Sequence, residues 1–244
     1  MAPNDVDRWC DHRCRRRPGN IEPAIRGSRA GRSGVRERGV GAVTGRLIAV
    51  EGVDASGKST QAQMLAESLG AVFTFQFGAT DVGEVIRRVL LDPDNDSLDD
   101  RTEALLIIAD KAQHVAQIVG PALEAGRDVV TDRFTASTLA YQGYGRGLDL
   151  AELQTMMRFA TGGIEPDLNL LLDIPLELAS RRLGSSLDRF EGTGDGFLDR
   201  VRAGYLAMAE ADPDHWVVVD ADGSVDDVAA RVMAAVQERL GGMR

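Results

Sequence analysis

The sequence predicts an α/β fold in which helices cover both faces of a five-stranded parallel sheet. Five short apolar runs alternate along the chain with stretches of helical periodicity. Runs that are apolar at nearly every position are typical of strands buried on both faces, as in a parallel sheet between two helical layers. A Gly-rich motif with phosphate-binding spacing lies between the first run and the first helical stretch. In such folds this loop binds its ligand at the carboxyl edge of the sheet.

The predicted elements follow one another from residue 46 onward. The apolar runs predict strands at 47–50, 71–75, 129–132, 168–173 and 216–220. Helical spacing predicts helices at 60–69, 81–91, 101–124, 150–160, 175–183, 197–211 and 225–240. We therefore expect one domain, residues 46–244, with a nucleotide bound where the strands end.

Local signals support several of these bounds. The segment 92–96 contains Pro, Asp and Asn and breaks the second helix. Gly126 ends the long third helix, and Pro175 stands at a first helical position, where proline is favoured. A polar, Gly-rich stretch, 184–196, separates the fifth and sixth helices. One side of the long helix is apolar, through Leu105, Ile108, Ala112, Val115 and Val119.

Residues 1–45 differ in composition from the rest of the chain. They hold ten arginines and five acidic residues, are rich in glycine, and show no helical or strand periodicity. We interpret them as a disordered Arg/Gly-rich extension that is dispensable, with Val43 as an alternative first residue. Two other readings stay open: a nucleic-acid-binding arm, and a metal site at Cys10, His12 and Cys14. Three potential ligands within five residues do not match zinc spacing.

The composition of the body excludes several classes of protein. Outside residues 1–45 there are 18 basic and 33 acidic residues, which argues against nucleic acid as a partner. No apolar run approaches membrane-spanning length, and no secretory signal is visible. The chain's two cysteines lie in the extension. A reducing, cytoplasmic location is therefore expected.

The phosphate-binding motif is GVDASGKS, residues 52–59. Gly52 and Gly57 allow a tight turn that aims backbone N–H groups at one anion, and the following helix adds its positive dipole end. Lys58 brings a full charge, and Ser59 offers a hydroxyl to Mg²⁺. ATP is expected to contact Gly52, Val53, Asp54, Ala55, Ser56, Gly57, Lys58, Ser59 and Thr60. The four asparagines form no guanine-reading motif, so a GTPase is not favoured.

A second informative stretch is VVTDRFTASTLAYQGYGRGLD, residues 129–149. Asp132 ends a buried strand, where a carboxylate can hold Mg²⁺ or its waters together with Ser59. Arg133 follows at the mouth of the same crevice and suits a bidentate phosphate contact. Tyr141, Gln142 and Arg146 place an aromatic ring and further donors nearby.

Four segments resemble the bacterial thymidylate kinases in order and spacing: EGVDASGKST, DRFTASTLAYQGYGRGLD, EPDLNLLLDIP and LDRFE. The resemblance covers nearly all of residues 46–240. It implies a P-loop nucleoside monophosphate kinase fold and a usually homodimeric enzyme. The implied reaction is Mg²⁺-dependent transfer of the ATP γ-phosphoryl group to dTMP, giving dTDP.

The resemblance also implies a role for each matching residue. Lys58 and the loop amides would hold the ATP phosphates, and Asp54 would face the acceptor 3′-hydroxyl and the metal region. Arg133 would bind the dTMP phosphate. Tyr141 would favour a deoxyribose, while Thr138 and Gln142 would contact the base.

In the bacterial subtype a catalytic arginine comes from a mobile lid, here the polar segment after the helix that begins at Pro175. Arg189, in LDRFE, matches the motif best. Arg181 and Arg182 are open alternatives, since both also fit a solvated helix face. An inserted arginine is worth ~10³ to 10⁵ in rate in related phosphoryl transfers.

Three positions depart from the family pattern. The family's Arg-Glu-Pro-Gly-Gly-Thr segment reads FQFGAT here, residues 75–80, without the charged pair. Ile107 replaces an aromatic that stacks on thymine, and Lys111 replaces an arginine of the acceptor site, which keeps the charge but loses the fork. Phe75 or Phe77 could supply a ring from the other side.

These departures keep other functions in view. One alternative is a kinase of the same fold that acts on dUMP or on a deoxynucleoside. Another is a non-catalytic regulatory protein that binds nucleotide and engages a partner through its Arg-rich extension.

Overall fold

The sheet matches the prediction from the apolar runs. The computed structural model describes residues 45–95, 97–183 and 196–241. Within them the strands are β1 (Leu47–Glu51), β2 (Val72–Phe75), β3 (Val129–Asp132), β4 (Leu168–Asp173) and β5 (Trp216–Asp220). All neighbouring strands are parallel, in the order β2-β3-β1-β4-β5. The predicted α/β fold with a five-stranded parallel sheet is confirmed.

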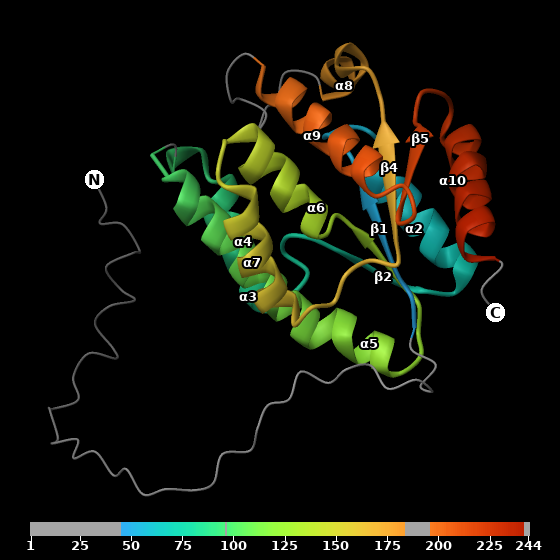
Figure 1. Cartoon of the computed structure of the whole chain (residues 1–244), viewed down its shortest axis with the longest axis horizontal. Helices are drawn as coiled ribbons and strands as arrows, with labels where there is room; N and C mark the ends of the chain where they lie inside the picture. Colours follow the sequence, from blue (N-terminus) through green and yellow to red (C-terminus); the bar gives the residue numbers. More distant parts are fainter. Residues whose placement is uncertain (1–44, 96, 184–195, 242–244) are drawn as a thin grey trace, which may run out of the picture. The chain divides into compact units, whose positions relative to one another are not determined.

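Helices cover both faces of this sheet (Figure 1). On one face α2 (Lys58–Leu69) packs beside α10 (Val225–Leu240). The other face carries α9 (Phe197–Ala211) and a long helical segment that begins with α4 (Asp100–His114). No helix among the described residues is both long enough and apolar enough to cross a membrane.

The remaining helices pack around this framework. α3 (Asp81–Leu91) and α7 (Leu150–Thr161) lie mainly against α4, and the short η1 (Pro93–Asn95) follows α3. α8 (Leu176–Leu183) follows β4. Predicted and observed helix bounds agree within two residues except in the segment 101–124.

The segment 101–124 is not one regular α-helix. After α4 the backbone forms a π-helical turn, η2 (Val115–Val119), before α5 (Gly120–Glu124). The N–H of Gly120 bonds to the carbonyl of Val115, one residue beyond the α-helical partner. Pro121 has no N–H to continue the α-helical ladder, which accounts for a wider turn just before it.

The sequence did not predict the helical structure after β3. Here α6 (Thr135–Thr138) runs into a second π-helical stretch, η3 (Leu139–Gly145). Glycine disfavours helices, yet two glycines of η3 are required by packing. A Cβ on Gly143 would lie 2.3 Å from Leu150, and one on Gly145 would lie 2.6 Å from Phe197 of α9. Contacts between η3 and distant elements therefore outweigh local propensity.

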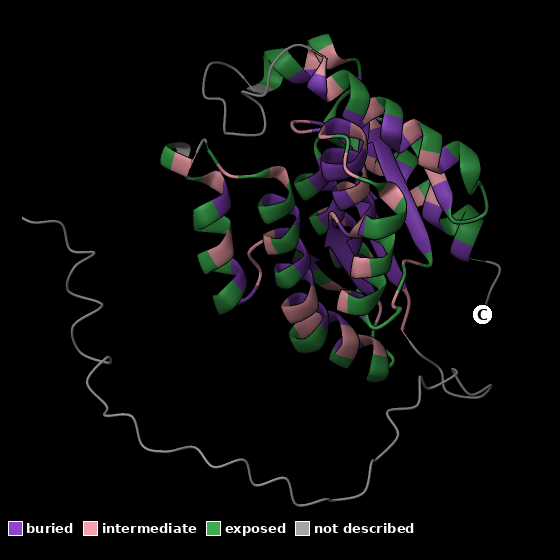
Figure 2. Ribbon diagram, turned by 60° about the vertical axis from the view of Figure 1, so that its left-hand side comes forward, coloured by how far each residue is buried: buried purple, intermediate pink, exposed green. Residues whose placement is uncertain are grey.

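The buried strands form the centre of the core, shown in purple in Figure 2. Alternate residues of β1 face opposite layers. Ile48 and Val50 belong to the cluster that includes Leu65 of α2, whereas Leu47 and Ala49 pack in the cluster with η2 and α5. The register pairs Val50 with Asp132 of β3, so the ends of these two central strands lie side by side. That juxtaposition brings together the two motifs found in the sequence.

Candidate active site

The phosphate-binding loop joins β1 to α2. Gly52 has φ 144°, and a Cβ there would lie 2.6 Å from the carbonyl oxygen of Leu172 in β4, so only glycine fits. Gly57 begins α2 with φ 92°, and no side chain caps that helix. The first N–H groups of α2 are thus left for a ligand, as expected of an anion site at a helix N-terminus.

Loop residues differ in how they face this site. Asp54, Ala55, Gly57, Lys58, Ser59 and Thr60 line a surface groove that continues past Asp132 to β2. Val53 and Ser56 are buried behind it. We expect Val53 and Ser56 to serve through their backbone.

The chain contains two lysines, Lys58 and Lys111, and both lie buried in this region. Nζ of Lys58 donates a hydrogen bond to the carbonyl oxygen of Val53 at 2.6 Å and lies 3.8 Å from Asp54. Burial lowers the pKa of Lys58 from 10.5 to about 8, and the charge of Arg133 adds to this effect. Burial likewise lowers the pKa of Lys111 to about 8.

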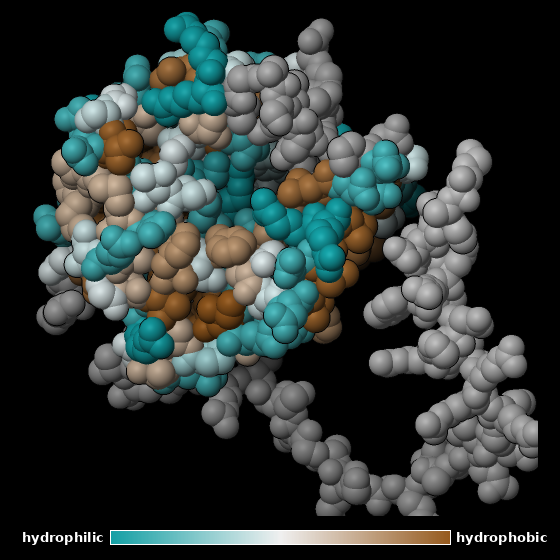
Figure 3. Space-filling view, turned by 180° about the vertical axis from the view of Figure 1, so that it is seen from behind, coloured by the Kyte–Doolittle hydropathy of each residue, from teal (hydrophilic) through white to brown (hydrophobic). Residues whose placement is uncertain are grey.

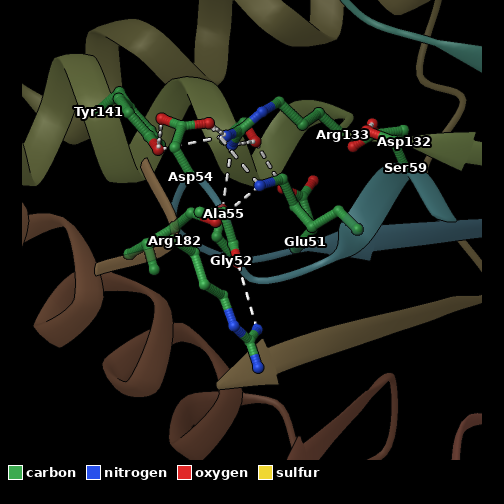
Figure 4. Close-up of polar contacts among 12 residues, drawn as sticks. Glu51, Gly52, Asp54, Ala55, Ser59, Asp132, Arg133, Tyr141 and Arg182 are labelled. Atoms are coloured by element: carbon green, nitrogen blue, oxygen red, sulfur yellow. Dashed lines mark hydrogen bonds and ion pairs between the residues drawn. The ribbon is translucent and has the colours of Figure 1, made fainter. Parts of the chain in front are cut away.

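Arg133 follows β3 and is the centre of a buried hydrogen-bond network (Figure 4). Its Nη1 donates to the carbonyl oxygen of Gly52 at 3.1 Å, and its Nη2 forms an ion pair with Asp54. The hydroxyl of Tyr141 donates to the other oxygen of Asp54 at 2.7 Å. Burial alone would raise the pKa of Asp54, but the charges of Arg133 and Lys58 hold it well below its usual range. Asp54 is therefore ionised at neutral pH.

Glu51 holds this network through hydrogen bonds to residues around Arg133, and the sequence did not predict this role. The side chain is fully buried and accepts hydrogen bonds from the N–H of Phe134 at 2.7 Å and from Ser137 Oγ at 2.6 Å. Tyr205 of α9 donates to the same carboxylate at 3.1 Å, and its hydroxyl also accepts from Arg133. A charged residue that ends a buried strand next to a phosphate loop was the available signal.

Asp132 and Ser59 fit a divalent cation. The hydroxyl of Ser59 donates to one oxygen of Asp132, so the loop and the end of β3 meet here. The other oxygen, Oδ1, is buried and has no hydrogen-bond partner among the described residues. A buried carboxylate oxygen left open beside a phosphate loop is a suitable ligand for Mg²⁺. The described residues contain no cluster of three or more His, Cys, Asp or Glu side chains that would hold a metal by themselves.

A pocket of about 670 Å³, measured with the solvent at its mouth, opens beside Arg133. All seven residues predicted to bind the acceptor line it: Asp54, Ile107, Lys111, Arg133, Thr138, Tyr141 and Gln142. Its lining also includes Phe77, Phe134, Leu91 and Gln76. Of the two phenylalanines considered as a replacement for the stacking aromatic, Phe77 lines this pocket, whereas Phe75 lines the neighbouring groove.

Two of the predicted base contacts differ in availability. Nε2 of Gln142 donates to the buried Glu103 at 2.9 Å, and Arg146 pairs with the same carboxylate at 3.1 Å. Oγ1 of Thr138 is buried and lacks a hydrogen-bond partner among the described residues. Thr138 is therefore the freer of the two to meet a ligand.

The three arginines considered for the lid differ in what the structure shows of their contacts. Nη1 of Arg182, on α8, donates to the carbonyl oxygen of Ala55 in the phosphate loop at 3.3 Å (Figure 4). Arg181 is exposed on the same helix. Arg189 lies outside the described residues.

The depressed lysine pKa values give a direct test by NMR. In protein labelled with ¹³Cε-lysine, we expect two ε-carbon resonances that titrate near pH 8 instead of near the usual 10.5. Lys111→Met removes one and so assigns both. ATP should raise the midpoint of the Lys58 resonance because phosphates stabilise the ammonium. Two midpoints near 10.5 would contradict the lowering of both pKa values by burial.

The same shift makes stability depend on pH. Between about pH 8 and 10.5 the folded protein binds fewer protons at Lys111 than the unfolded chain does, so the free energy of unfolding rises with pH over this window. Relative to Lys111→Met, wild type should gain up to about 3 kcal/mol across it. Urea unfolding of both proteins at several pH values measures the difference, and a constant difference would refute the shift.

Comparisons with known proteins identify the family of this chain. A sequence model of the thymidylate kinase family matches residues 50–232. The thymidylate kinase of Desulforudis audaxviator is 44% identical over 208 residues, which cover 81% of this chain and 94% of that protein. That of Pelotomaculum thermopropionicum is 46% identical over 204 residues, covering 80% and 94%. The crystal structure of thymidylate kinase from Ehrlichia chaffeensis superposes with a TM-score of 0.67 at 28% identity, covering 80% of this chain and all of that one. The chain belongs to the thymidylate kinase family.

Proposed function

We propose that this protein phosphorylates dTMP to dTDP with ATP, a step toward dTTP. One observation carries the proposal: Arg133 and Asp54 stand between the phosphate loop and an acceptor pocket lined by every residue expected to contact dTMP. Membership of the thymidylate kinase family supports the same assignment. A purely regulatory nucleotide-binding protein would have no use for the acceptor pocket.

The charged groups suit an in-line phosphoryl transfer. Lys58 and the loop amides bind the ATP phosphates, after Lys58 exchanges the carbonyl of Val53 for a phosphate oxygen. Arg133 binds the acceptor phosphate and holds it in line with the γ-phosphoryl group. The ionised Asp54 accepts a hydrogen bond from the acceptor sugar, next to the ring of Tyr141.

Mg²⁺ is the proposed cofactor. Ser59 and Asp132 would hold it, directly or through water, and the open Oδ1 of Asp132 supports this. When bound, the ion neutralises charge on the β- and γ-phosphate oxygens.

Assaying acceptors tests the proposed function. The full chain and residues 43–244 are given ATP, Mg²⁺ and dTMP, dUMP, dCMP, dGMP, UMP or thymidine. We expect strong preference for dTMP, and equal rates for both chains because we propose that residues 1–45 take no part. Lys58→Ala and Arg133→Ala should each lower kcat/KM by a hundredfold or more while remaining folded.

Other results would change the assignment. Preference for dUMP or thymidine would keep the fold and the ATP site but move the substrate. ATP binding without turnover of any acceptor, together with loss of function on removal of residues 1–45, would favour the regulatory alternative.

We also propose that lid arginines stabilise the transferring phosphoryl group, with Arg182 and Arg189 in this role. Arg182 already reaches the phosphate loop, whereas Arg181 on the same helix is the matched control. Arg182→Ala and Arg189→Ala should each lower kcat at least tenfold with little change in the KM for dTMP. Arg181→Ala should stay within about twofold of wild type. Equal losses in Arg181→Ala and Arg182→Ala would show a general charge effect instead.

A cytoplasmic homodimer is the proposed state of the enzyme. Figure 3 shows small apolar patches, in brown, between polar residues on this face of the molecule. On α3, Val82, Val85 and Val89 are spaced along one side of the helix and are 50%, 51% and 37% exposed. Such a stripe suits burial against a second copy.

Sedimentation tests the homodimer. Wild type should sediment at about twice the chain mass of 26.2 kDa, and Val85→Asp should shift it toward the monomer. Val225→Asp is the control, because Val225 is 53% exposed at the start of α10, away from α3. A monomeric wild type, or dissociation of both variants alike, would reject this interface.

A further inference from the structure

Gln76 is a buried side chain of the acceptor pocket to which neither the motif nor the expected roles assign a contact. It directly follows β2, and its backbone N–H donates to the carbonyl of Asp132 at 2.9 Å, which fixes it at the carboxyl edge of the sheet. The residue is 9% exposed. It lines both the acceptor pocket and the neighbouring groove of the phosphate loop.

Lys111 fixes the orientation of the Gln76 amide. The ammonium of Lys111 hydrogen-bonds to Oε1 of Gln76 and lies 4.9 Å from the ring centroid of Phe134. Because an ammonium only donates, the amide oxygen must face it and the NH₂ group must turn away. Nε2 of Gln76 is buried and has no hydrogen-bond partner among the described residues. A buried donor held in one direction without an acceptor is poised for a ligand oxygen.

The pocket has one polar and one largely apolar part. Arg133, Asp54 and Tyr141 form the polar part, where the acceptor phosphate and sugar are expected. The apolar side chains Phe77, Leu91, Ile107 and Phe134 suit the base, and the charged side chains Arg87 and Asp110 also line the pocket. The carboxylate of Asp110 already accepts a hydrogen bond from the N–H of Gly78 at 3.1 Å. C4 of a pyrimidine lies opposite N1, the atom that carries the sugar. The group at C4 is therefore directed away from Asp54, toward the part of the pocket where Lys111 lies over Phe134.

We propose that Nε2 of Gln76 donates a hydrogen bond to the C4 carbonyl oxygen of the pyrimidine acceptor, and that Gln76 thereby selects a 4-oxo base over a 4-amino base. The inference rests on the proposed function. A 4-amino group would face the amide NH₂ and the Lys111 ammonium, which both only donate, so neither could satisfy it. Sites built to hydrogen-bond one substrate group reject analogues that leave their buried donors unpaired.

The test combines a change in the protein with a change in the ligand. Wild type and Gln76→Met are compared on dTMP and on 4-thio-dTMP, which keeps N3–H but replaces O4 by sulfur, a weaker hydrogen-bond acceptor. Kd by calorimetry and kcat/KM are both measured. Replacement of O4 by sulfur should weaken binding to wild type about tenfold and to Gln76→Met less than twofold, because the variant lacks the amide donor of Gln76. Gln154→Met, an exposed glutamine of α7, should behave as wild type.

A second variant guards against a merely structural role. Gln76→Glu keeps the shape and the partner of Lys111 but replaces the donor by an acceptor. We expect its kcat/KM ratio of dCMP to dTMP to rise at least tenfold over wild type. A residue that only supports Lys111 would leave that ratio unchanged, and this result would overturn the proposal. So would an equal effect of O4 replacement in wild type and Gln76→Met.

Failure of the proposed function can be distinguished from failure of this inference. If wild type binds dTMP but does not phosphorylate it, the activity is wrong, and the Kd values still decide the role of Gln76. If dTMP does not bind at all, both proposals fall. Coupling of Gln76 to the phosphate, seen on comparing thymidine with dTMP, without coupling to O4, would place its donor on the phosphate and reject selection at C4.

Discussion

The site depends on the buried guanidinium of Arg133. Its backbone N–H bonds to Val50 at 2.9 Å, and its side chain reaches Gly52, Asp54 and the hydroxyl of Tyr205. Arg133 is therefore held by groups from three parts of the fold: strand β1, the phosphate loop and the side chain of Tyr205 on α9. A charge that is largely removed from water is costly unless it is paired and hydrogen-bonded, and these partners supply both the pairing and the hydrogen bonds. Asp54 is the carboxylate that forms an ion pair with this guanidinium, and the charge of Asp132 adds to its effect.

Sequence patterns were sufficient where local physics decides structure. Continuous apolar runs predicted every strand of the sheet within one residue, and the loop motif predicted the tight turn in which Gly52 and Gly57 have positive φ. The rest depends on distant contacts. In the helical segment 139–145, Gly143 lies close to Leu150 of α7 and Gly145 lies close to Phe197 of α9, and Glu51 and Tyr205 matter only because the fold brings them together. No spacing along the chain records a meeting of residues that are 154 positions apart.

The departures from the family pattern belong to one structural unit. Gln76, Ile107 and Lys111 line the same pocket, and Gln76 and Lys111 are bonded to each other. A glutamine and a lysine in contact carry one positive charge, whereas a glutamate and an arginine would cancel. The ammonium of Lys111 is buried beside Phe134. The carboxylates of Glu51 and Asp110 stabilise its charged form and so partly offset the lowering of its pKa by burial. Under the proposed role of Gln76, directional contacts from this pair would take over part of the base recognition expected of a stacking aromatic.

The two cations proposed to bind phosphate groups already have internal partners in this structure. Lys58 donates to Val53, and Arg133 is paired with Asp54. In the proposed function, substrate phosphates would replace existing contacts and would not have to order side chains that are mobile in water, which would lower the entropic cost of binding. Asp54 must then keep its charge while its guanidinium partner turns to the acceptor phosphate, and the hydroxyl of Tyr141 at 2.7 Å remains as a donor. Because Arg133 and Tyr141 both donate to Asp54, Arg133 could turn to the substrate while Tyr141 still hydrogen-bonds to the carboxylate. This sharing explains why an arginine, a tyrosine and a carboxylate from three segments of the chain occur together at the junction of the two pockets.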